Sequence, residues 1–581
     1  GKDTFLKGVA QAIRVYAMSV FNIPKNICKA ICDAIARYWW GDTQEKKKIH
    51  WKAWWKMCIP KKEGGMGFRD LHCFNKAMLA KQCWSLLSDP DSLCAQVLRA
   101  KYYPDGDLMN ASLKKGSSYT WQSIMAGMKT FKLGAIWRPG NGASIDIWSD
   151  QWIPTSHDRK VMTPRGLCLL QKVQDLIDPI SGNWDEQLVR ENFWPVDAER
   201  ILQIPLSSHG QSDFISWHFS KSGCFTVRSA YHITWKNEYR TRARLDSGGG
   251  RIDPHPVWKS LWGRTIPPKV HVFNWRVLHG IVPCYCTLTD RHMKSPVICP
   301  VCRTTPEDLR HMLFTCDRSK KVWEELGLKP TIENAVAQER SGSVILEKLL
   351  CSDLEGEARI PIANGVEMIM VAAWYLWWDR LKISHDEKCG TPVRTTMSIR
   401  GIVANALAMK PRVKDRKVRW ERPAMGVLKL NVDASYHSDE GSGATGAVIR
   451  DCTDAFIAGC CYYKQHAMDA PSMEALALLD GLRLADNLGI STLVVESDSL
   501  EIVQAILDPS DYRASAAVVT DDCRKLLTAF GRATVVHCAR EGNAAAHGLA
   551  RASYRGNFSG EWRDKPPDFL LPFLVTDMII V

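Results

Sequence analysis

The stretch VLKLNVDASYHSDEGSGATGAVIR, residues 427–450, decides the fold of the C-terminal part of this 581-residue chain. Apolar and polar side chains alternate from residue 427 up to Asp433, and this period of two predicts a β-strand. The glycine-rich run 441–446 predicts a turn, and the apolar run Ala447–Ile449 predicts a second strand that returns as a hairpin. Asp433 is therefore expected on a central strand.

Two further carboxylates occur in patterns that would bring them to the same place. Glu474 lies in the first turn of a helical pattern that starts at Pro471 and Ser472. Asp498, in LVVESDS, closes the short β-run Leu493, Val494, Val495. If this run pairs beside the first strand and the helix crosses over it, the three carboxylates converge at one sheet edge. The apolar face of the helix would be formed by Leu476, Leu479, Leu482 and Leu488.

A cluster of three carboxylates requires positive charge, because like charges a few ångströms apart cannot all stay ionised unpaired. Oxygen ligands without Cys or His suit Mg²⁺, with Mn²⁺ as the substitute. Two such ions can hold the attacking water and the leaving oxygen of a phosphodiester. The sequence therefore predicts Asp433, Glu474 and Asp498 as metal ligands and catalytic residues.

This order of acids, followed by Asn543 and a site residue four positions later, resembles the ribonuclease H type domain over about Met425–Tyr554. The resemblance implies an α/β fold with a mixed five-stranded sheet and flanking helices. It also implies endonucleolytic, metal-dependent cleavage of the RNA strand of RNA–DNA hybrids. The family usually has a fourth carboxylate where this chain has His547, which we assign to the catalytic set. His537 lies where the family often has a mobile histidine that helps proton transfer, and a structural role at a strand end is the alternative.

A second cluster of candidate ligands lies upstream in CPVCRTTPEDLRHMLFTC, residues 299–316. The CxxC pair presents Cys299 and Cys302 from one turn, and His311 with Cys316 can complete a tetrahedron, plausibly from one helix. The spacing predicts a closed, structural Zn²⁺ site, because three Cys and one His leave no open coordination position. Buried free thiols are the alternative.

The surroundings of this cluster carry a second resemblance. The segments GCFTVRSAYHI (223–233) and VWKSLWGRTIPPKVHVFNWRVLHGIVPC (257–284) resemble the reverse-transcriptase zinc-binding domain of plant LINE-type, non-LTR retroelement proteins. KIHWKAWWKMCIPKKEGGMGFRDLHCFNKAMLAKQCW (48–84) is similar to the region that follows the polymerase palm in the same proteins. Nothing in the sequence resembles the palm itself, so we expect no polymerase activity. We interpret the chain as the C-terminal part of such a polyprotein, or a derivative of one.

Together these patterns predict a multidomain protein that is mainly α in its N-terminal and middle regions and carries a small zinc module. We expect a post-palm helical region at 1–150, a connector at 151–222 and the zinc-binding domain at 223–330. A helical connector with a basic linker would occupy 331–424, and the ribonuclease H-like domain would occupy 425–581. The apolar run 366–378 is too short to span a bilayer and predicts a buried helix. We place a further linker at 339–357.

Charge is unevenly distributed along the chain. Residues 1–150 carry 23 Lys and Arg against 12 Asp and Glu, whereas residues 425–581 carry 13 against 21. The basic part predicts contact with nucleic acid, either RNA, DNA or a hybrid. The linker KPRVKDRKVRWER (410–422) could hold a phosphate backbone, or it could simply be solvated. Aromatic side chains among the N-terminal cations could stack on bases, although core packing is the alternative: Trp39, Trp40, Trp51, Trp54 and Trp55.

Two functions from different classes follow. One is a ribonuclease that acts on RNA–DNA hybrids, and the other is a catalytically decayed or co-opted nucleic-acid-binding protein. The acid triad favours the first, whereas His547 and the acidic surplus of the domain favour the second. The 20 cysteines, irregularly spaced outside the zinc candidate, predict a reducing compartment, nucleus or cytoplasm.

Overall fold

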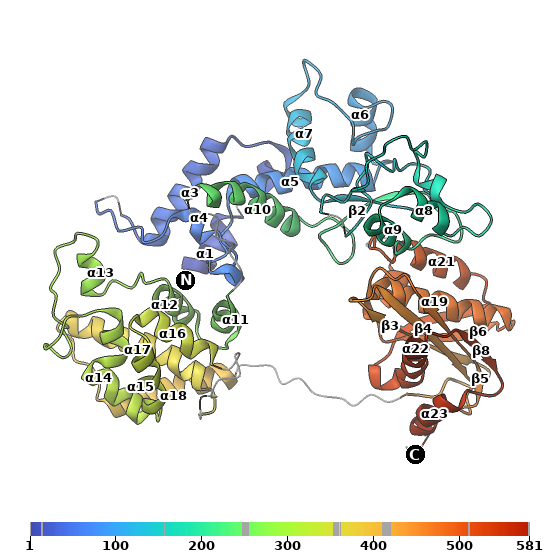
Figure 1. The fold of residues 1–581 in the computed structure, drawn as a ribbon. Helices are drawn as coiled ribbons and strands as arrows, with labels where there is room; N and C mark the ends of the chain where they lie inside the picture. The colour runs from blue at the N-terminus through green and yellow to red at the C-terminus, as the bar shows by residue number, and fades with distance from the viewer. Residues whose placement is uncertain are drawn as a thin grey trace. The chain divides into compact units, whose positions relative to one another are not determined.

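The computed structural model describes residues 2–12, 15–43, 45–155, 157–246, 255–352, 360, 362–408, 420–508 and 512–578. The chain divides into two compact units (Figure 1). The first comprises residues 1–14, 24–72 and 240–414, and the second comprises residues 15–23, 73–239 and 415–581. Most of the basic linker, residues 409–419, lies outside the described residues. The five expected domain limits stay a prediction.

The regular elements in the described part of the first unit are helices, apart from one isolated bridge between Ile298 and Pro306. Its long helix α17 (Gly365–Ser384) contains the apolar run 366–378 and buries its residues 366, 367, 369–373 and 376, so the expected buried helix is confirmed, although Trp378 at its end is exposed. The linker expected at 339–357 is wrong, because the apolar residues of 345–351 pack as helix α16 (Gly342–Cys351). The other elements are α1 (Lys2–Phe5), η1 (Leu6–Ala10), α3 (Lys25–Trp40), α4 (Trp54–Met57), η2 (Lys61–Glu63), α11 (Pro256–Gly263), α12 (Pro268–Leu278), α13 (Tyr285–Thr289), η4 (His311–Thr315), α14 (Asp317–Glu325), α15 (Lys329–Gln338) and α18 (Pro392–Ala408).

The helices bear on two possible roles, base stacking and membrane crossing. Trp39 and Trp40 are buried at the end of α3, which favours core packing over base stacking for these two rings. Among the helices that the structure describes, none is both long enough and apolar enough to cross a membrane.

The second unit begins with a helical segment and a two-stranded sheet. Strand β1 (Ala135–Arg138) pairs antiparallel with β2 (Phe214–Trp217), and Arg138 lies opposite Phe214. A core around the buried ring of Trp152 packs beneath the loops that follow β1. The accompanying elements are α2 (Val15–Val20), α5 (Leu71–Ser88), α6 (Leu93–Tyr102), α7 (Tyr119–Lys132), η3 (Val173–Leu176), α8 (Glu186–Asn192), α9 (Pro195–Leu202) and α10 (Val227–Asp246).

The C-terminal part of the second unit is an α/β domain built on a six-stranded mixed sheet (Figure 1). Its strand order is β7-β6-β3-β4-β5-β8, with β3 parallel to β6, β6 parallel to β7, and the other pairs antiparallel. The strands are β3 (Leu428–His437), β4 (Ser442–Arg450), β5 (Phe456–Lys464), β6 (Thr492–Ser497), β7 (Arg532–His537) and β8 (Gly560–Arg563). The helices are α19 (Ala470–Asn487), α20 (Leu500–Leu507), α21 (Ala517–Leu527), η6 (Arg540–Asn543), α22 (Ala544–Gly556), η7 (Asp568–Leu570) and α23 (Leu571–Met578).

The expected fold class is confirmed, with one strand more than the five expected. The additional strand β8 has only four residues, too few for an alternating pattern to be visible in the sequence. Helix α19 covers one face of the sheet, where Val432 packs with Leu482, and α22 covers the other, where Val448 packs with Leu549. The sheet is therefore the middle layer of three.

The glycine-rich run 441–446 is not the turn that we expected. The reversal occurs at 438–441, and strand β4 already starts at Ser442. Gly446 lies inside β4 because the backbone of α22 passes directly over it. A Cβ atom at this position would lie 2.6 Å from the carbonyl oxygen of Ala546 and 2.6 Å from the amide nitrogen of Ala550. The glycine thus permits close packing of the helix that carries His547.

A buried carboxylate joins the segment before β2 to the α/β domain. Asp522 on α21 is 1% exposed and accepts hydrogen bonds from Ser207 Oγ at 2.9 Å, Ser208 N at 2.7 Å and Ser208 Oγ at 2.8 Å. His209 Nδ1 lies 3.1 Å from the same carboxylate. Nearby, Arg513 N donates to the carbonyl of Ser222 at 2.6 Å. Residues 207–222 are therefore bonded to the domain that follows them much later in the chain.

The close approach at Gly446 predicts that Gly446→Ala destabilises the protein. The new methyl group would meet helix backbone that cannot rotate away, so we expect a loss of about 1–3 kcal/mol in the free energy of unfolding. Urea unfolding of the full chain measures this loss. Gly531→Ala is the matched control, because its Cβ would meet its nearest neighbour at an ordinary 3.4 Å. Equal midpoints for Gly446→Ala and wild type would contradict the described packing of α22.

Candidate metal centres and active site

The structure brings Asp433, Glu474 and Asp498 together at one edge of the sheet. One carboxylate oxygen of each lies within 4.8 Å of the others. Asp433 and Asp498 emerge from neighbouring parallel strands, since Val432 is in register with Ser497. Glu474 enters from α19, which has a proline in its first turn and an N-cap residue, Asp469, whose carboxylate accepts a hydrogen bond from Ser472 N. Strand register and helix start together determine the convergence.

Two of the three acids, Glu474 and Asp498, lie in an environment that opposes their ionisation. Burial raises the pKa of Glu474 well above its usual range, and the charges of Asp433 and Asp498 raise it further. Burial and Asp433 likewise raise the pKa of Asp498, although Arg540 opposes the shift. Glu474 Oε2 is buried and has no hydrogen-bond partner among the described residues. A divalent cation would satisfy both the unpaired oxygen and the excess negative charge, so the residues fit Mg²⁺ or Mn²⁺.

Asn543 connects the last helix to the central strand beside this site. Its Nδ2 donates to the carbonyl of Val432 at 2.8 Å, and its Oδ1 accepts from Asn431 at 3.2 Å. Its side chain also bonds Asp498 and lowers the pKa of that carboxyl. Asn543 therefore fixes the backbone next to Asp433 and the position of Asp498 at once.

A buried polar network beneath the site was not found by sequence reasoning. Lys429 Nζ lies 2.7 Å from Glu496 Oε1, and Asn431 Nδ2 donates to Glu496 Oε2 at 3.1 Å. The guanidinium of Arg450 stacks 3.8 Å from the ring centroid of Trp420. The signal was present in β3, where polar residues occur at 429, 431 and 433 on one face. A polar alternation on a central strand indicates a buried network on that face.

His547 contacts the acid cluster directly. Its Nδ1 lies 2.6 Å from Asp433 Oδ2, and this hydrogen bond is the main cause of a raised pKa for His547. The imidazole thus occupies one oxygen of a predicted metal ligand. His537 is exposed at the end of β7. Among the described contacts, none joins His537 to the three acids. Both roles considered for His537 stay predictions.

The contact with Asp433 predicts that His547→Asp increases cleavage activity in Mg²⁺. The variant adds an oxygen ligand and removes a group that protonates beside Asp433. The pKa of His547 is raised above its usual value of about 6.5, so in wild type the imidazolium already forms at a higher pH and repels the cation. We therefore expect the acid limb of the activity profile to lie at lower pH in His547→Asp than in wild type. Initial rates in Mg²⁺ and Mn²⁺ from about pH 5.5 to about pH 9, a range that brackets the titration of histidine, measure this.

The stability of the metal-free protein gives an independent reading of the same contact. Because the folded-state pKa is raised, the His547–Asp433 contact stabilises the protein fully below the unfolded pKa. This contribution is lost as the pH rises through the folded pKa. The stability of wild type relative to His547→Asn should therefore decrease as the pH rises above about 6.5, the usual pKa of an unfolded histidine. Parallel stability curves and identical acid limbs would show that His547 lies outside the metal site.

The second cluster is formed by Cys299, Cys302, His311 and Cys316, whose donor atoms all lie within 4.8 Å of one another. The CxxC segment makes a tight loop in which Cys299 N donates to Thr305 O at 2.9 Å. Arg303 adopts a left-handed conformation with φ of 60° to close this loop. His311 Nε2 lies 3.3 Å from Cys302 Sγ. The expectation that His311 and Cys316 share one helix is wrong, because a π-helical turn ends at Thr315 and Cys316 caps the next helix.

The thiols of this cluster are prepared for ligation. Burial raises the pKa of Cys302, but hydrogen bonds from Thr304 and Thr305 outweigh it and lower the value to about 5. The Cys299 thiol donates to Cys316, which lowers the pKa of Cys316 and raises that of Cys299. Thiolates are the ligating form of cysteine. The donor set of three sulfurs and one imidazole fits Zn²⁺ and would hold it in a structural role.

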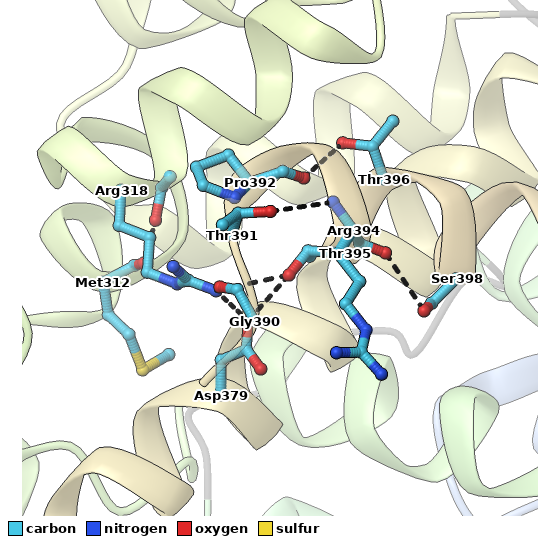
Figure 2. A network of polar contacts seen from close by, with 11 residues as sticks. Met312, Arg318, Asp379, Gly390, Thr391, Pro392, Arg394, Thr395, Thr396 and Ser398 are labelled. Carbon is cyan, nitrogen blue, oxygen red and sulfur yellow. Dashed lines mark hydrogen bonds and ion pairs between the residues drawn. The ribbon is translucent and has the colours of Figure 1, made fainter. Parts of the chain in front are cut away.

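Two buried ion pairs support this cluster from the neighbouring helices. Glu307, inside the ligand loop, receives a bidentate pair from Arg380 of α17 at 2.8 and 2.7 Å. Arg318, two residues after the last ligand, donates to Asp379 at 2.5 Å and to the carbonyl of Gly390 at 2.9 Å (Figure 2). Thr395 of α18 completes the second network by donating to Asp379 at 3.2 Å (Figure 2). The ligand loop is thus attached to α17 and α18.

This geometry predicts zinc bound to the purified protein at close to one equivalent. Thiolate ligation contributes folding free energy directly, so Cys302→Ser should lose the metal and lower the unfolding temperature of the protein. Elemental analysis and thermal unfolding measure the two effects. Cys389→Ser is the control, because Cys389 is a free, half-buried cysteine of the same unit outside the cluster. Less than about half an equivalent of zinc in wild type would contradict a ligated site.

Comparisons with known proteins agree with both clusters. Residues 431–553 match the reverse transcriptase-like family, and residues 225–323 match the family described as zinc-binding in reverse transcriptase. The "Putative ribonuclease H protein" of Arabidopsis thaliana is 28% identical over 604 residues, which cover 100% of this chain and 93% of the relative. An uncharacterized mitochondrial protein of Arabidopsis thaliana is 40% identical over 143 residues, which cover 24% of this chain and 93% of the relative.

Solved structures of ribonucleases H are also similar to part of the chain. Ribonuclease H1 of Halobacterium salinarum is 20% identical with a TM-score of 0.21, and the match covers 23% of this chain and 100% of that protein. LC11 ribonuclease H1, in complex with an RNA/DNA hybrid, is 18% identical with a TM-score of 0.21 and covers 22% and 98%.

The chain belongs to the family of plant retroelement proteins that combine a reverse-transcriptase zinc-binding region with a ribonuclease H-like domain. The expected family is thereby confirmed.

Proposed function

We propose that the ribonuclease H-like domain hydrolyses the RNA strand of RNA–DNA hybrids with the help of a divalent cation. The observation that carries this proposal is the convergence of Asp433, Glu474 and Asp498 around a buried, unpaired carboxylate oxygen. Three carboxylates this close together are an unfavourable arrangement for a purely structural role, and bound cations between them would make it favourable. The family match to a protein named for ribonuclease H supports the reaction class.

The residues of the site would divide the work as follows. A bound Mg²⁺ or Mn²⁺ would supply Lewis-acid stabilisation of the charge that develops on the phosphodiester. Asp433, central in β3, would hold this ion from one side, with Glu474 and Asp498 from α19 and the end of β6. Asn543 would keep Asp498 in place through its side-chain hydrogen bond. Hydrolysis adds water across one phosphorus–oxygen bond of the RNA strand, so no further reactant is required.

The choice of substrate follows from chemistry that only RNA offers. The 2′-hydroxyl of the RNA strand and the groove shape of the hybrid distinguish it from DNA duplexes. The chain as a whole is basic, with a formal net charge of +13, and the surplus lies mainly in its first 150 residues. These residues would attract the nucleic acid, because the ribonuclease H-like domain itself is acidic.

A second function, nucleic acid binding without cleavage, is favoured by one specific contact. The short bond between His547 and Asp433 places an imidazole where the family usually has a fourth carboxylate. A site with one less negative charge would hold a second cation more weakly. In this case the chain would retain its nucleic acid surfaces and its structural Zn²⁺ while losing hydrolysis.

Asp498→Asn separates the two functions. Removing one of the three acids should reduce the rate of cleavage of a labelled RNA–DNA hybrid in Mg²⁺ or Mn²⁺ by roughly a hundredfold or more. The folded state should not suffer, because the substitution relieves repulsion that raises the pKa of Glu474 in the metal-free protein. Gel analysis of cleavage and thermal unfolding measure the two effects. Asp486→Asn, at an exposed position of α19, is the control for activity and stability. Equal cleavage by wild type and Asp498→Asn would overturn the assignment of the site.

A further inference from the structure

Trp420 lies near the end of the basic linker and packs onto the ribonuclease H-like domain. Neither family match includes it, since the matched segments are residues 225–323 and 431–553. Its indole Nε1 donates to Asn431 Oδ1 at 2.9 Å, and the guanidinium of Arg450 lies 3.8 Å from its ring centroid. A side chain that precedes the first strand of the domain is therefore part of the buried polar network beneath the acid site.

Residues 420–422, which we call the clasp, are attached to the domain at two further points. The carbonyl oxygen of Glu421 accepts a hydrogen bond from Lys429 Nζ on β3. Arg422 Nε donates to Asp454 Oδ2 at 2.6 Å in the connection between β4 and β5. The side chain of Asp454 is only 4% exposed, so this ion pair is partly shielded from water. The clasp thus joins the linker to β3 and to the β4–β5 connection.

Asn431 is the buried partner of Trp420, and both ends of its carboxamide are occupied. Its Nδ2 donates to Glu496 Oε2 at 3.1 Å and to Asn543 Oδ1 at 3.2 Å. Its Oδ1 accepts from Trp420 and, at 3.5 Å, from Arg450. A carboxamide nitrogen only donates and its oxygen only accepts. Turning the group over would therefore oppose donor to donor on one side and acceptor to acceptor on the other.

Asn543 transmits this orientation to the acid site. Its oxygen is occupied by the amide of Asn431, so its Nδ2 faces the other way, where it donates to the carbonyl of Val432 at 2.8 Å. The same side chain bonds the Asp498 carboxyl. Asn543 is buried, and a buried amide depends on such protein partners for its hydrogen bonds. The indole N–H of Trp420 is therefore two oriented amides away from a predicted metal ligand.

The ring and the N–H of Trp420 have separate tasks. The ring covers the buried guanidinium of Arg450, and a desolvated cation–π contact of this kind stabilises a fold. The N–H is the nearer of the two donors to Asn431 Oδ1, at 2.9 Å against 3.5 Å for Arg450. A distance of 3.5 Å is long for a hydrogen bond, so the indole is the principal donor that fixes the amide. A substitution that keeps a ring but removes the N–H isolates this second task.

We propose that Trp420 is a positioning residue of the acid site. Its indole N–H orients the amide of Asn431, which orients that of Asn543, and the second amide holds the Asp498 carboxylate where it binds a divalent cation. That Asp498 binds a cation rests on the proposed function. The clasp does more than attach the linker, because the metal site is complete only while residues 420–422 are docked on the domain.

Binding of Mn²⁺ to the full chain, without nucleic acid, tests this role apart from cleavage. Electron paramagnetic resonance of free Mn²⁺ measures the affinity, and Asp498→Asn gives the background that does not involve the acid site. Trp420→Phe should weaken the Asp498-dependent affinity about fivefold, the effect of one lost neutral hydrogen bond. Its unfolding temperature should stay close to that of wild type, because an aromatic ring remains against Arg450.

A double-mutant cycle separates positioning from a general loss of stability. In an Asn543→Ala background, Trp420→Phe should no longer change the Mn²⁺ affinity, because the path from the clasp to Asp498 is already broken. In cleavage assays Trp420→Phe should need a correspondingly higher Mn²⁺ concentration for half of its maximal rate. Trp148→Phe is the matched control, since Trp148 Nε1 donates to Leu170 O at 2.8 Å in the same unit, outside the clasp and the acid site.

Wild-type Mn²⁺ affinity in Trp420→Phe would overturn the positioning role and leave the proposed function standing. Additive losses from Trp420→Phe and Asn543→Ala would overturn it too, because the two side chains would then act separately. If wild type shows no Mn²⁺ binding that depends on Asp498, the metal site and the positioning role both fail. If wild type binds Mn²⁺ through Asp498 but cleaves no hybrid, the proposed hydrolysis fails, and a weakened affinity of Trp420→Phe still establishes the positioning role.

Discussion

Repulsion among Asp433, Glu474 and Asp498 is the constraint on which the rest of the C-terminal domain depends. The sheet register and the capped start of α19 hold like charges within 4.8 Å of one another. Such an arrangement reduces the stability of the metal-free fold, because burial and neighbouring charge raise the pKa of two of the acids. The surrounding apolar core must therefore provide the stability that the site removes.

Charges also surround the cysteine cluster, but there they attract each other. There the ligand loop is attached by two buried ion pairs, Arg380 with Glu307 and Arg318 with Asp379. These pairs leave the loop stable only while each partner is present, because a buried charge without its partner is costly. One centre is built from charges that repel and the other is surrounded by charges that are matched. This difference fits a reactive role for the first and a structural role for the second.

Much of the α/β domain could be predicted from the sequence because its signals are local. Strand β3, helix α19 and strand β6 each have a clear period, and their register follows from it. The turn at 438–441 was misplaced because Gly446 serves a packing contact with α22, which a local pattern does not reveal. Cys316 was placed in a helix with His311 because spacing alone does not show where a π-helical turn ends. Arg138 belongs to no recognisable motif, so its burial could not be predicted from the sequence.

The Asp522 contacts imply that the genetic and the physical boundaries of this protein differ. A gene segment that encodes only residues 425–581 would contain every acid of the site, yet it would leave Asp522 without the donors from residues 207–209. A domain separated at this sequence boundary would leave a buried carboxylate without its hydrogen-bond donors. Selection that preserves the enzyme-like domain must therefore also preserve a loop more than two hundred residues away in the chain. The stretch of chain needed for this fold is therefore longer than the domain that its motifs delimit.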